Sequence, residues 1–140
     1  MPDSVILYQH DTVTLCQEKH YLHLTWQGTI ELETYQEVLN LALKVVQEKH
    51  IHQFLIDQRN LEFVGIEAQA WLTVHWFPKL EKVTPQKAHM AIVRSKKLFV
   101  KVASETVARR LNRDRDFCQI NYFEDITTAQ NWLSTSPSEG

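Results

Sequence analysis

The chain contains very little glycine, only three residues among 140. Neither a GxGxxG fingerprint nor a GxxxxGK[ST] loop is present, so the sequence offers no glycine-rich cradle for nucleotide phosphates. Cysteine is also scarce: Cys16 and Cys118 are the two in the chain, and they form no CxxC pair. The N-terminus lacks the basic and apolar regions of an export signal. Two thiols in such a domain favour a reduced, cytoplasmic protein.

Long apolar runs and a strong charge of either sign are missing too. No apolar run approaches the ~20 residues that a transmembrane helix needs. The net charge of -2 does not favour a general binder of nucleic acid. Hydrophobic residues nevertheless make up 44% of the chain, enough for one globular core. We expect a single domain over residues 1–133 and a disordered polar tail over residues 134–140.

The pattern of apolar residues changes along the chain. Alternation predicts an antiparallel meander of three strands, at residues 5–8, 12–16 and 20–26. After Gly28 the apolar spacing becomes three and four, which predicts a helix over residues 32–49. Strands and helices then alternate, which favours a mixed α/β sheet.

The second half of the chain predicts further strands and helices. Strands are expected at residues 54–56, 90–93 and 117–123, the first of them ending at Asp57. Helices are expected after Gly65, over residues 98–113 and over residues 126–133. Pro78 must end the helix that follows Gly65 or open a new turn.

This order of elements resembles the STAS family. The resemblance rests on Trp26-Gln27-Gly28, on residues 54–61 (FLIDQRNL), on Trp71 and on Trp76-Phe77-Pro78. Its nearest members by pattern are small bacterial proteins described as anti-sigma-factor-antagonist-like, which are related in architecture to the CRAL-TRIO lipid-binding domain. The resemblance implies an α/β fold with a mixed sheet of four or five strands and about four helices. It implies signalling, partner docking or ligand sensing more often than catalysis.

The sequence departs from the family at the position of its phosphorylated serine. Phosphoswitch members carry Asp-Ser-Ser-Gly, or a close variant, at the start of the helix after the Asp-ended strand. Residues 62–67 here read EFVGIE and contain neither Ser nor Thr. We therefore predict that the protein is not a serine-phosphorylated antagonist of the usual kind.

Polar residues follow the predicted strand at residues 54–56. Ligands of open α/β sheets bind beyond the carboxyl ends of strands, which makes Asp57, Arg59 and Asn60 candidate ligand-binding residues. The planar guanidinium of Arg59 suits a carboxylate or a phosphate, and Asp57 is placed to orient it. The alternative is a structural ion pair between Arg59 and Asp57.

The densest aromatic group belongs to the helix predicted after Gly65. Trp71 and His75 are one turn apart, and Trp76 is adjacent. These three residues are candidates for lining a pocket around an apolar ligand, with the imidazole as its polar group. The alternative is that both tryptophans fill the core, since aromatic residues at helical spacing usually do.

Metal and nucleophilic chemistry are poorly supported. His50 and His52 form an HxH pair, but no third ligand converges by sequence, so we expect no metal and no cofactor. There is no GxSxG motif, and both cysteines lie within strand patterns that predict buried, inert thiols.

Positive charge is concentrated between residues 94 and 115, a segment that contains eight Lys and Arg but only two acidic residues. This segment is a candidate docking surface for an acidic protein, an anionic lipid surface or a phosphate group; the alternative is a solvated helix face. The candidate docking residues are Lys96, Lys97, Lys101, Arg109, Arg110 and Arg113.

The leading functional prediction is a non-enzymatic, cytoplasmic module for regulation or ligand sensing. The main alternative is a carrier of an apolar, acid-headed molecule or lipid, with Arg59 on the head group. A third reading is an enzyme with His75 as general base. Because unpaired strand edges invite pairing, a homodimer through the edge of the meander is a further expectation.

Overall fold

Six strands form one mixed sheet whose order in space follows their order in the chain. The computed structural model describes residues 4–84, 87–94 and 118–135. The first three strands are antiparallel, and the last four pair in parallel. The strands are β1 (Val5–His10), β2 (Val13–Gln17), β3 (Leu22–Ile30), β4 (Gln53–Val64), β5 (Ala88–Val93) and β6 (Cys118–Phe123).

The predicted α/β class and N-terminal meander are confirmed, but the strand number is corrected from four or five to six. Each apolar run that the sequence indicated becomes a paired strand. The helices in the described ranges are α1 (Leu32–Lys49), a continuous helical stretch of α2 (Ile66–Trp71), η1 (Leu72–Trp76) and α3 (Phe77–Val83), and α5 (Ile126–Thr135). The helix expected over residues 98–113 lies outside the described residues.

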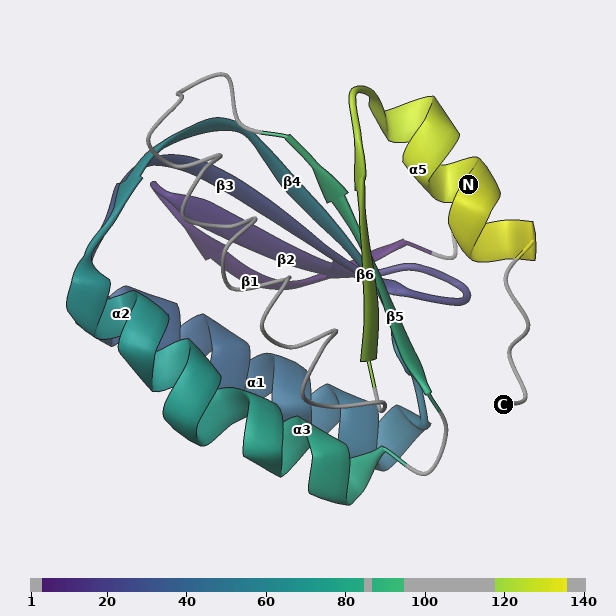
Figure 1. Cartoon of the computed structure of the whole chain (residues 1–140), viewed down its shortest axis with the longest axis horizontal. Coiled ribbons are helices and arrows are strands. Elements are labelled where there is room, and N and C mark those ends of the chain that lie inside the picture. The colour runs from purple at the N-terminus through teal and green to yellow at the C-terminus, as the bar shows by residue number, and fades with distance from the viewer. Residues whose placement is uncertain (1–3, 85–86, 95–117, 136–140) are drawn as a thin grey trace.

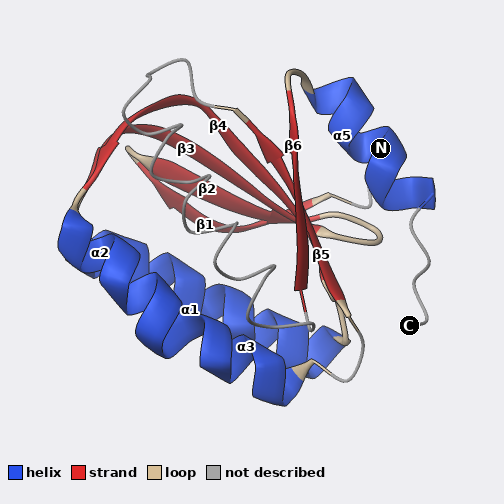
Figure 2. Cartoon of the chain, viewed as in Figure 1, coloured by secondary structure: helices blue, strands red, loops and turns tan. Residues whose placement is uncertain are grey.

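Two layers of helices enclose the sheet unequally (Figures 1 and 2). Helices α1, α2 and α3 cover one face, and α5 lies against the other. The first face carries Leu15, Leu24 and Phe54 in the main core. The second face, which we call the α5 face, carries Leu55, Ala91 and Val93 against Ala129 and Leu133 of α5. Among the described helices, none is long and apolar enough to span a membrane.

The predicted bounds of α1 are confirmed, because its helical spacing and its ends agree. His50 ends it with a left-handed backbone, at φ 60°, which is a common helix terminus. At the other end of the chain, α5 continues to Thr135. Ser134 and Thr135 are therefore helical rather than part of the expected tail, whose remaining residues lie outside the described ranges.

The fourth strand is much longer than predicted. Asp57 was expected to end it, but β4 runs on to Val64. Asp57 is the last β4 residue that pairs with β5, opposite Val93, and from there β4 continues as an arm paired with β3 as far as Val64. The prediction failed because polar residues after Ile56 resemble a loop, whereas here they form the half-solvated part of a strand.

The helix after Gly65 passes through Pro78 with a wider turn. Of the two predicted outcomes, Pro78 opens a new turn, in the first turn of α3. The preceding π-helical segment η1 ends with the N–H of Phe77 donating to the carbonyl of Leu72. Proline has no N–H, and its ring would press on the carbonyl four residues back. The wide turn before it relieves that conflict and lets the helical stretch continue.

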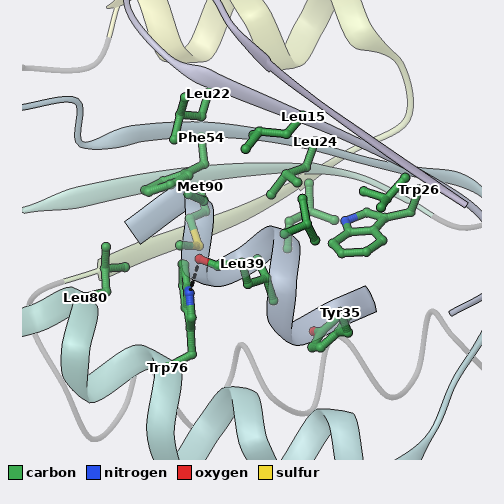
Figure 3. Packing of buried hydrophobic residues seen from close by; sticks show 14 of the residues in the cluster. Leu15, Leu22, Leu24, Trp26, Tyr35, Leu39, Phe54, Trp76, Leu80 and Met90 are labelled. Atoms are coloured by element: carbon green, nitrogen blue, oxygen red, sulfur yellow. Dashed lines mark hydrogen bonds between the residues drawn. The ribbon is translucent and has the colours of Figure 1, made fainter. Parts of the chain in front are cut away.

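The main core fills the space between the sheet and the helices (Figure 3). Trp76 points from the helix toward Phe54 and Met90 of the sheet, and it is 2% exposed. Its indole N–H donates to the carbonyl oxygen of Leu39 at 2.7 Å. The hydrogen bond satisfies the one polar atom that this large side chain brings into the core. Trp76 thus ties the α2–α3 stretch to α1.

Candidate functional site

The most organised polar group on the sheet is the pair Asp57 and Arg59. The Arg59 guanidinium donates from Nε to Asp57 Oδ1 at 3.0 Å and from Nη2 to Oδ2 at 2.9 Å. The backbone N–H of Arg59 donates to the same Oδ1 at 3.1 Å. The side chain of Asp57 is 8% exposed and that of Arg59 43%. A buried carboxylate is therefore held by a bidentate cation that reaches water.

A bulge in β4 produces this geometry. Thr25 of β3 pairs with Asp57, yet Gln27 pairs with Asn60, so β4 holds one residue more than β3 across this interval. The extra residue frees the N–H of Arg59 from the ladder, and the carboxylate two residues earlier accepts it. Asn60 is exposed and continues the arm. The predicted pairing of Asp57 with Arg59 is present, but on a strand rather than in a loop.

Asp57 and Arg59 each shift the pKa of the other in favour of the ionised form. Burial is the largest influence and raises the pKa of Asp57, but the hydrogen bonds and charge of Arg59 together outweigh it, so the pKa is lowered. The same hydrogen bond raises the pKa of Arg59, with further help from the charges of Asp57 and Asp125. Asp57 and Arg59 are therefore both ionised at neutral pH and form the ion pair that was the alternative prediction. Ligand binding by Asp57, Arg59 and Asn60 stays a prediction.

His23 lies beside this pair on the same face of the sheet. It precedes Thr25, the β3 partner of Asp57, by two residues. Burial lowers its pKa, although the charges of Glu18 and Asp57 oppose that shift. Its Nε2 atom is buried and receives no hydrogen bond from the described residues. The imidazole is thus neutral near pH 7 and adds no positive charge beside Arg59.

The structure does not bring Trp71, His75 and Trp76 together around one space. Trp76 is core, and His75 is exposed. Trp71 is half-buried, with its ring edge-on to Tyr35 at 6.1 Å between centroids. The wide η1 turn explains the difference, because five residues rather than four now separate side chains on one side of the helix. Ligand binding by these residues stays a prediction.

Two further predictions concern the basic docking residues and a metal site. The six basic docking candidates from Lys96 to Arg113 lie outside the described residues. Within the described ranges, no group of three or more His, Cys, Asp or Glu side chains is arranged to hold a metal ion. His52 contacts His89 instead, at 6.4 Å between ring centroids.

The two cysteines differ in access, and a thiol reagent should distinguish them. Cys118 is 2% exposed, and burial raises its pKa to about 12; Cys16 is half-buried, so the prediction of burial was too strong for it. We expect iodoacetamide at pH 8 to modify Cys16 slowly and Cys118 only after unfolding. Peptide mass spectrometry of the native and denatured protein measures both rates. Faster modification of Cys118 in the native state would contradict its placement.

Sequence reasoning missed an exposed apolar surface at the start of the helix after β4. Ile66 is 81% exposed, Val74 61% and Phe63 43%. The Phe63 ring lies over Gly65, whose added Cβ would be 3.9 Å from the ring. We call these three residues the apolar stripe. Its signal was available, because Ile66, Ala70 and Val74 recur every four residues on the side opposite Ala68.

Acidic residues surround the apolar stripe. Glu62 and Glu67 adjoin it in the sequence, and residues 60–78 contain no Lys or Arg. Residues 26–43 carry Glu31, Glu33 and Glu37, again without Lys or Arg. The pairing of Ile30 with Val64 brings the beginnings of α1 and α2 to the same end of the sheet. Of the described residues, the two segments that meet beside the apolar stripe therefore carry acidic side chains and no Lys or Arg.

Solved structures of other proteins share this fold. An uncharacterised protein of the DUF3478 family with a SpoIIAA-like fold, from Shewanella loihica, is 21% identical; the match covers 93% of this chain and 94% of that one, with a TM-score of 0.60. An anti-sigma factor antagonist from Mycobacterium paratuberculosis is 14% identical; the match covers 96% and 97%, with a TM-score of 0.53. The predicted STAS-like fold is confirmed. No protein-family model and no curated protein matches the chain.

Proposed function

We propose that this chain is a cytoplasmic, non-enzymatic regulatory module that docks a protein partner through the apolar stripe. The observation that carries the proposal is the exposure of Phe63 and Ile66 at the junction of β4 and α2, and of Val74 further along the same helical stretch. Clustered apolar residues inside a polar rim are typical of protein–protein interfaces. The solved anti-sigma factor antagonist with this fold supports a regulatory role.

The acidic surroundings define the chemistry of the partner. Five glutamates and no Lys or Arg occupy the two segments that meet beside the apolar stripe, residues 26–43 and 60–78. A partner that presents apolar side chains among basic ones is complementary to this surface. Such complementarity raises the rate of association and makes it sensitive to salt. Because residues 62–67 contain no Ser or Thr, control by phosphorylation of this junction is not part of the proposal.

A photo-crosslinking residue at position 66 tests the proposal. In cells of the source organism we expect one protein to crosslink at position 66 and not at position 48, since Glu48 is exposed at the far end of α1. With that protein purified, Ile66→Gln should weaken binding about 30-fold, as expected for a central interface residue worth about 2 kcal/mol. Fluorescence anisotropy at 50 and 500 mM salt measures the affinity.

Val5→Gln is the matched control. Val5 is also an exposed apolar residue, at 50%, but it belongs to β1. Neither substitution should change the free energy of unfolding by more than about 0.5 kcal/mol, because both side chains are already in water. Equal loss of binding in the two variants, or binding that strengthens with salt, would refute docking through the apolar stripe.

The homodimer remains a separate prediction for β1. This strand is one edge of the described sheet, and Val5 and Ile6 on it are half-exposed or more. A register shift between Ile6 and Tyr8 interrupts its pairing with β2, and such bulges are a way of protecting sheet edges. Sedimentation equilibrium decides the state directly.

A further inference from the structure

Helix α5 is held on the sheet by apolar contacts and by two side-chain hydrogen bonds, one of which the Gln130 amide donates to the Tyr21 hydroxyl at 3.1 Å. Ala129 and Leu133 are buried against Leu55, Ala91 and Val93. At its far end, the Gln53 side chain donates to the carbonyl oxygen of Leu133 at 3.0 Å. Residues 126–135 contain no Asp, Glu, Lys, Arg or His. No charge on α5 itself can therefore respond to pH.

A buried histidine lies beneath this helix. His89 of β5 is 5% exposed, and its ring meets Trp132 of α5 edge-on at 5.6 Å between centroids. Its Nδ1 atom is buried and receives no hydrogen bond from the described residues. Packing of α5 therefore keeps one imidazole nitrogen away from both water and a protein partner.

The surroundings of His89 disfavour a positive charge. The ring of His52, which precedes β4, lies 6.4 Å away. Lys87, just before β5, adds another positive charge to this environment. From β6 the paired residue is the uncharged Gln119. Burial first, and then the charges of His52 and Lys87, lower the pKa of His89, and none of the described carboxylates opposes this shift.

We propose that His89 and Trp132 form an acid-sensitive latch: protonation of His89 releases α5 and uncovers the α5 face of the sheet. Release of α5 returns the imidazolium to water, while the rest of the core stays closed on the opposite face. The uncovered surface is the apolar row of Leu55, Ala91 and Val93, which is buried at neutral pH.

The direction of the pH effect follows from linkage. Because the folded-state pKa of His89 is lowered, its contribution to docking of α5 is complete above the ordinary histidine pKa of about 6.5. That contribution is lost as pH falls from there toward the folded-state pKa. One proton taken up on release changes the equilibrium by up to about tenfold per pH unit.

Hydrogen exchange of the full chain at pH 7.5, 6.5, 5.5 and 5.0, corrected for intrinsic rates, tests the latch. We expect protection of residues 126–135 to fall below pH 6.5, by up to about tenfold per unit, while α1 loses much less. His89→Phe keeps the aromatic contact with Trp132 and removes the titration, so its α5 protection should be constant. His23→Phe is the matched control, because His23 is another buried histidine with a lowered pKa and should leave the α5 response in place.

Any of three hydrogen-exchange results would overturn the latch: constant protection of α5 in the wild type, the same loss in His89→Phe, or simultaneous loss from α1 and α5. Proton NMR of the wild type provides a measurement that does not depend on the variant folding. The titration of His89 should coincide with the exchange broadening of α5 amides. Titration of His89 with α5 still protected also refutes the proposal.

Discussion

Replacing Trp76 with alanine should lower the free energy of unfolding by about 4 kcal/mol. Trp76 is 2% exposed, and its ring meets Phe54 and Phe77 edge-on at 6.3 and 5.1 Å between centroids. The substitution leaves a cavity between α1, α3 and the sheet and removes the hydrogen bond to Leu39. Since domains have only about 5–15 kcal/mol of stability, this substitution removes a large share of it.

Urea denaturation followed by circular dichroism measures this effect, and Trp71→Ala is its control. Trp71 has the same side chain, but it is half-buried and should cost roughly half as much. The comparison also separates the two readings of the aromatic group. If Trp76 lined a ligand pocket, its replacement would change the free energy of unfolding little. A loss of under about 1 kcal/mol in Trp76→Ala would therefore contradict its place in the core.

Arg59→Met should destabilise the protein by about 2 kcal/mol at pH 7 and much less near pH 4. Removal of one partner from a fully buried pair costs about 3–5 kcal/mol, and we expect less here because Arg59 is 43% exposed and water screens the pair. The cost arises because Asp57 is left ionised and buried. Without the guanidinium, burial remains the largest influence on this carboxyl group and raises its pKa, opposed in part by the backbone N–H of residue 59 and by His23. Acid therefore relieves the variant by protonating Asp57.

In the wild type, acid has the opposite effect on the contribution of Asp57 to stability. The folded-state pKa of Asp57 is lowered, so its stabilisation is present above the ordinary carboxyl pKa and is lost as pH falls through the folded-state value. Denaturant midpoints from pH 4 to pH 8 measure the difference between the two proteins. A deficit for Arg59→Met that is independent of pH would contradict this account.

Two further variants isolate the pair. Arg94→Met removes the partner of Glu124, whose side chain is 80% exposed, and should cost under about 1 kcal/mol. The double variant Asp57→Asn with Arg59→Met removes both charges and should be more stable at pH 7 than Arg59→Met alone. If the double variant is less stable than the wild type by the sum of the losses in Asp57→Asn and Arg59→Met, the two residues do not interact.

The sequence predicted those parts of the fold whose patterns depend on burial alone. The bounds of α1 followed from its one apolar face, and β5 followed from a run that is buried on both faces of the sheet. The extent of β4 did not follow, because its second half pairs on one side only and carries exposed polar residues, such as Asn60 and Glu62. Local composition there resembles a loop, and the pairing comes from β3, some thirty residues earlier.

The candidate site divides in the same way. The contact between Asp57 and Arg59 was predictable, since two residues of opposite charge lie close along the chain. The burial of Trp76 was one of the two predicted alternatives, but the exposure of His75 beside it was not predicted, because it depends on a wide turn that regular helical spacing does not include. The exposure of Ile66 and Val74 was missed although their spacing is visible in the sequence, because an apolar residue at helical spacing is usually assigned to the core.

The wide turn before Pro78 also fixes a rotational offset. A π turn is equivalent to one residue inserted into a regular helix, and one residue corresponds to about 100° around the axis. The segment thus aims Ile66 outward while Phe77 and Leu80 remain buried. A chain shortened by one residue between Gly65 and Pro78 would keep both sets of side chains but turn one against the other. The direction of the apolar stripe is therefore encoded in the length of this segment as much as in its composition.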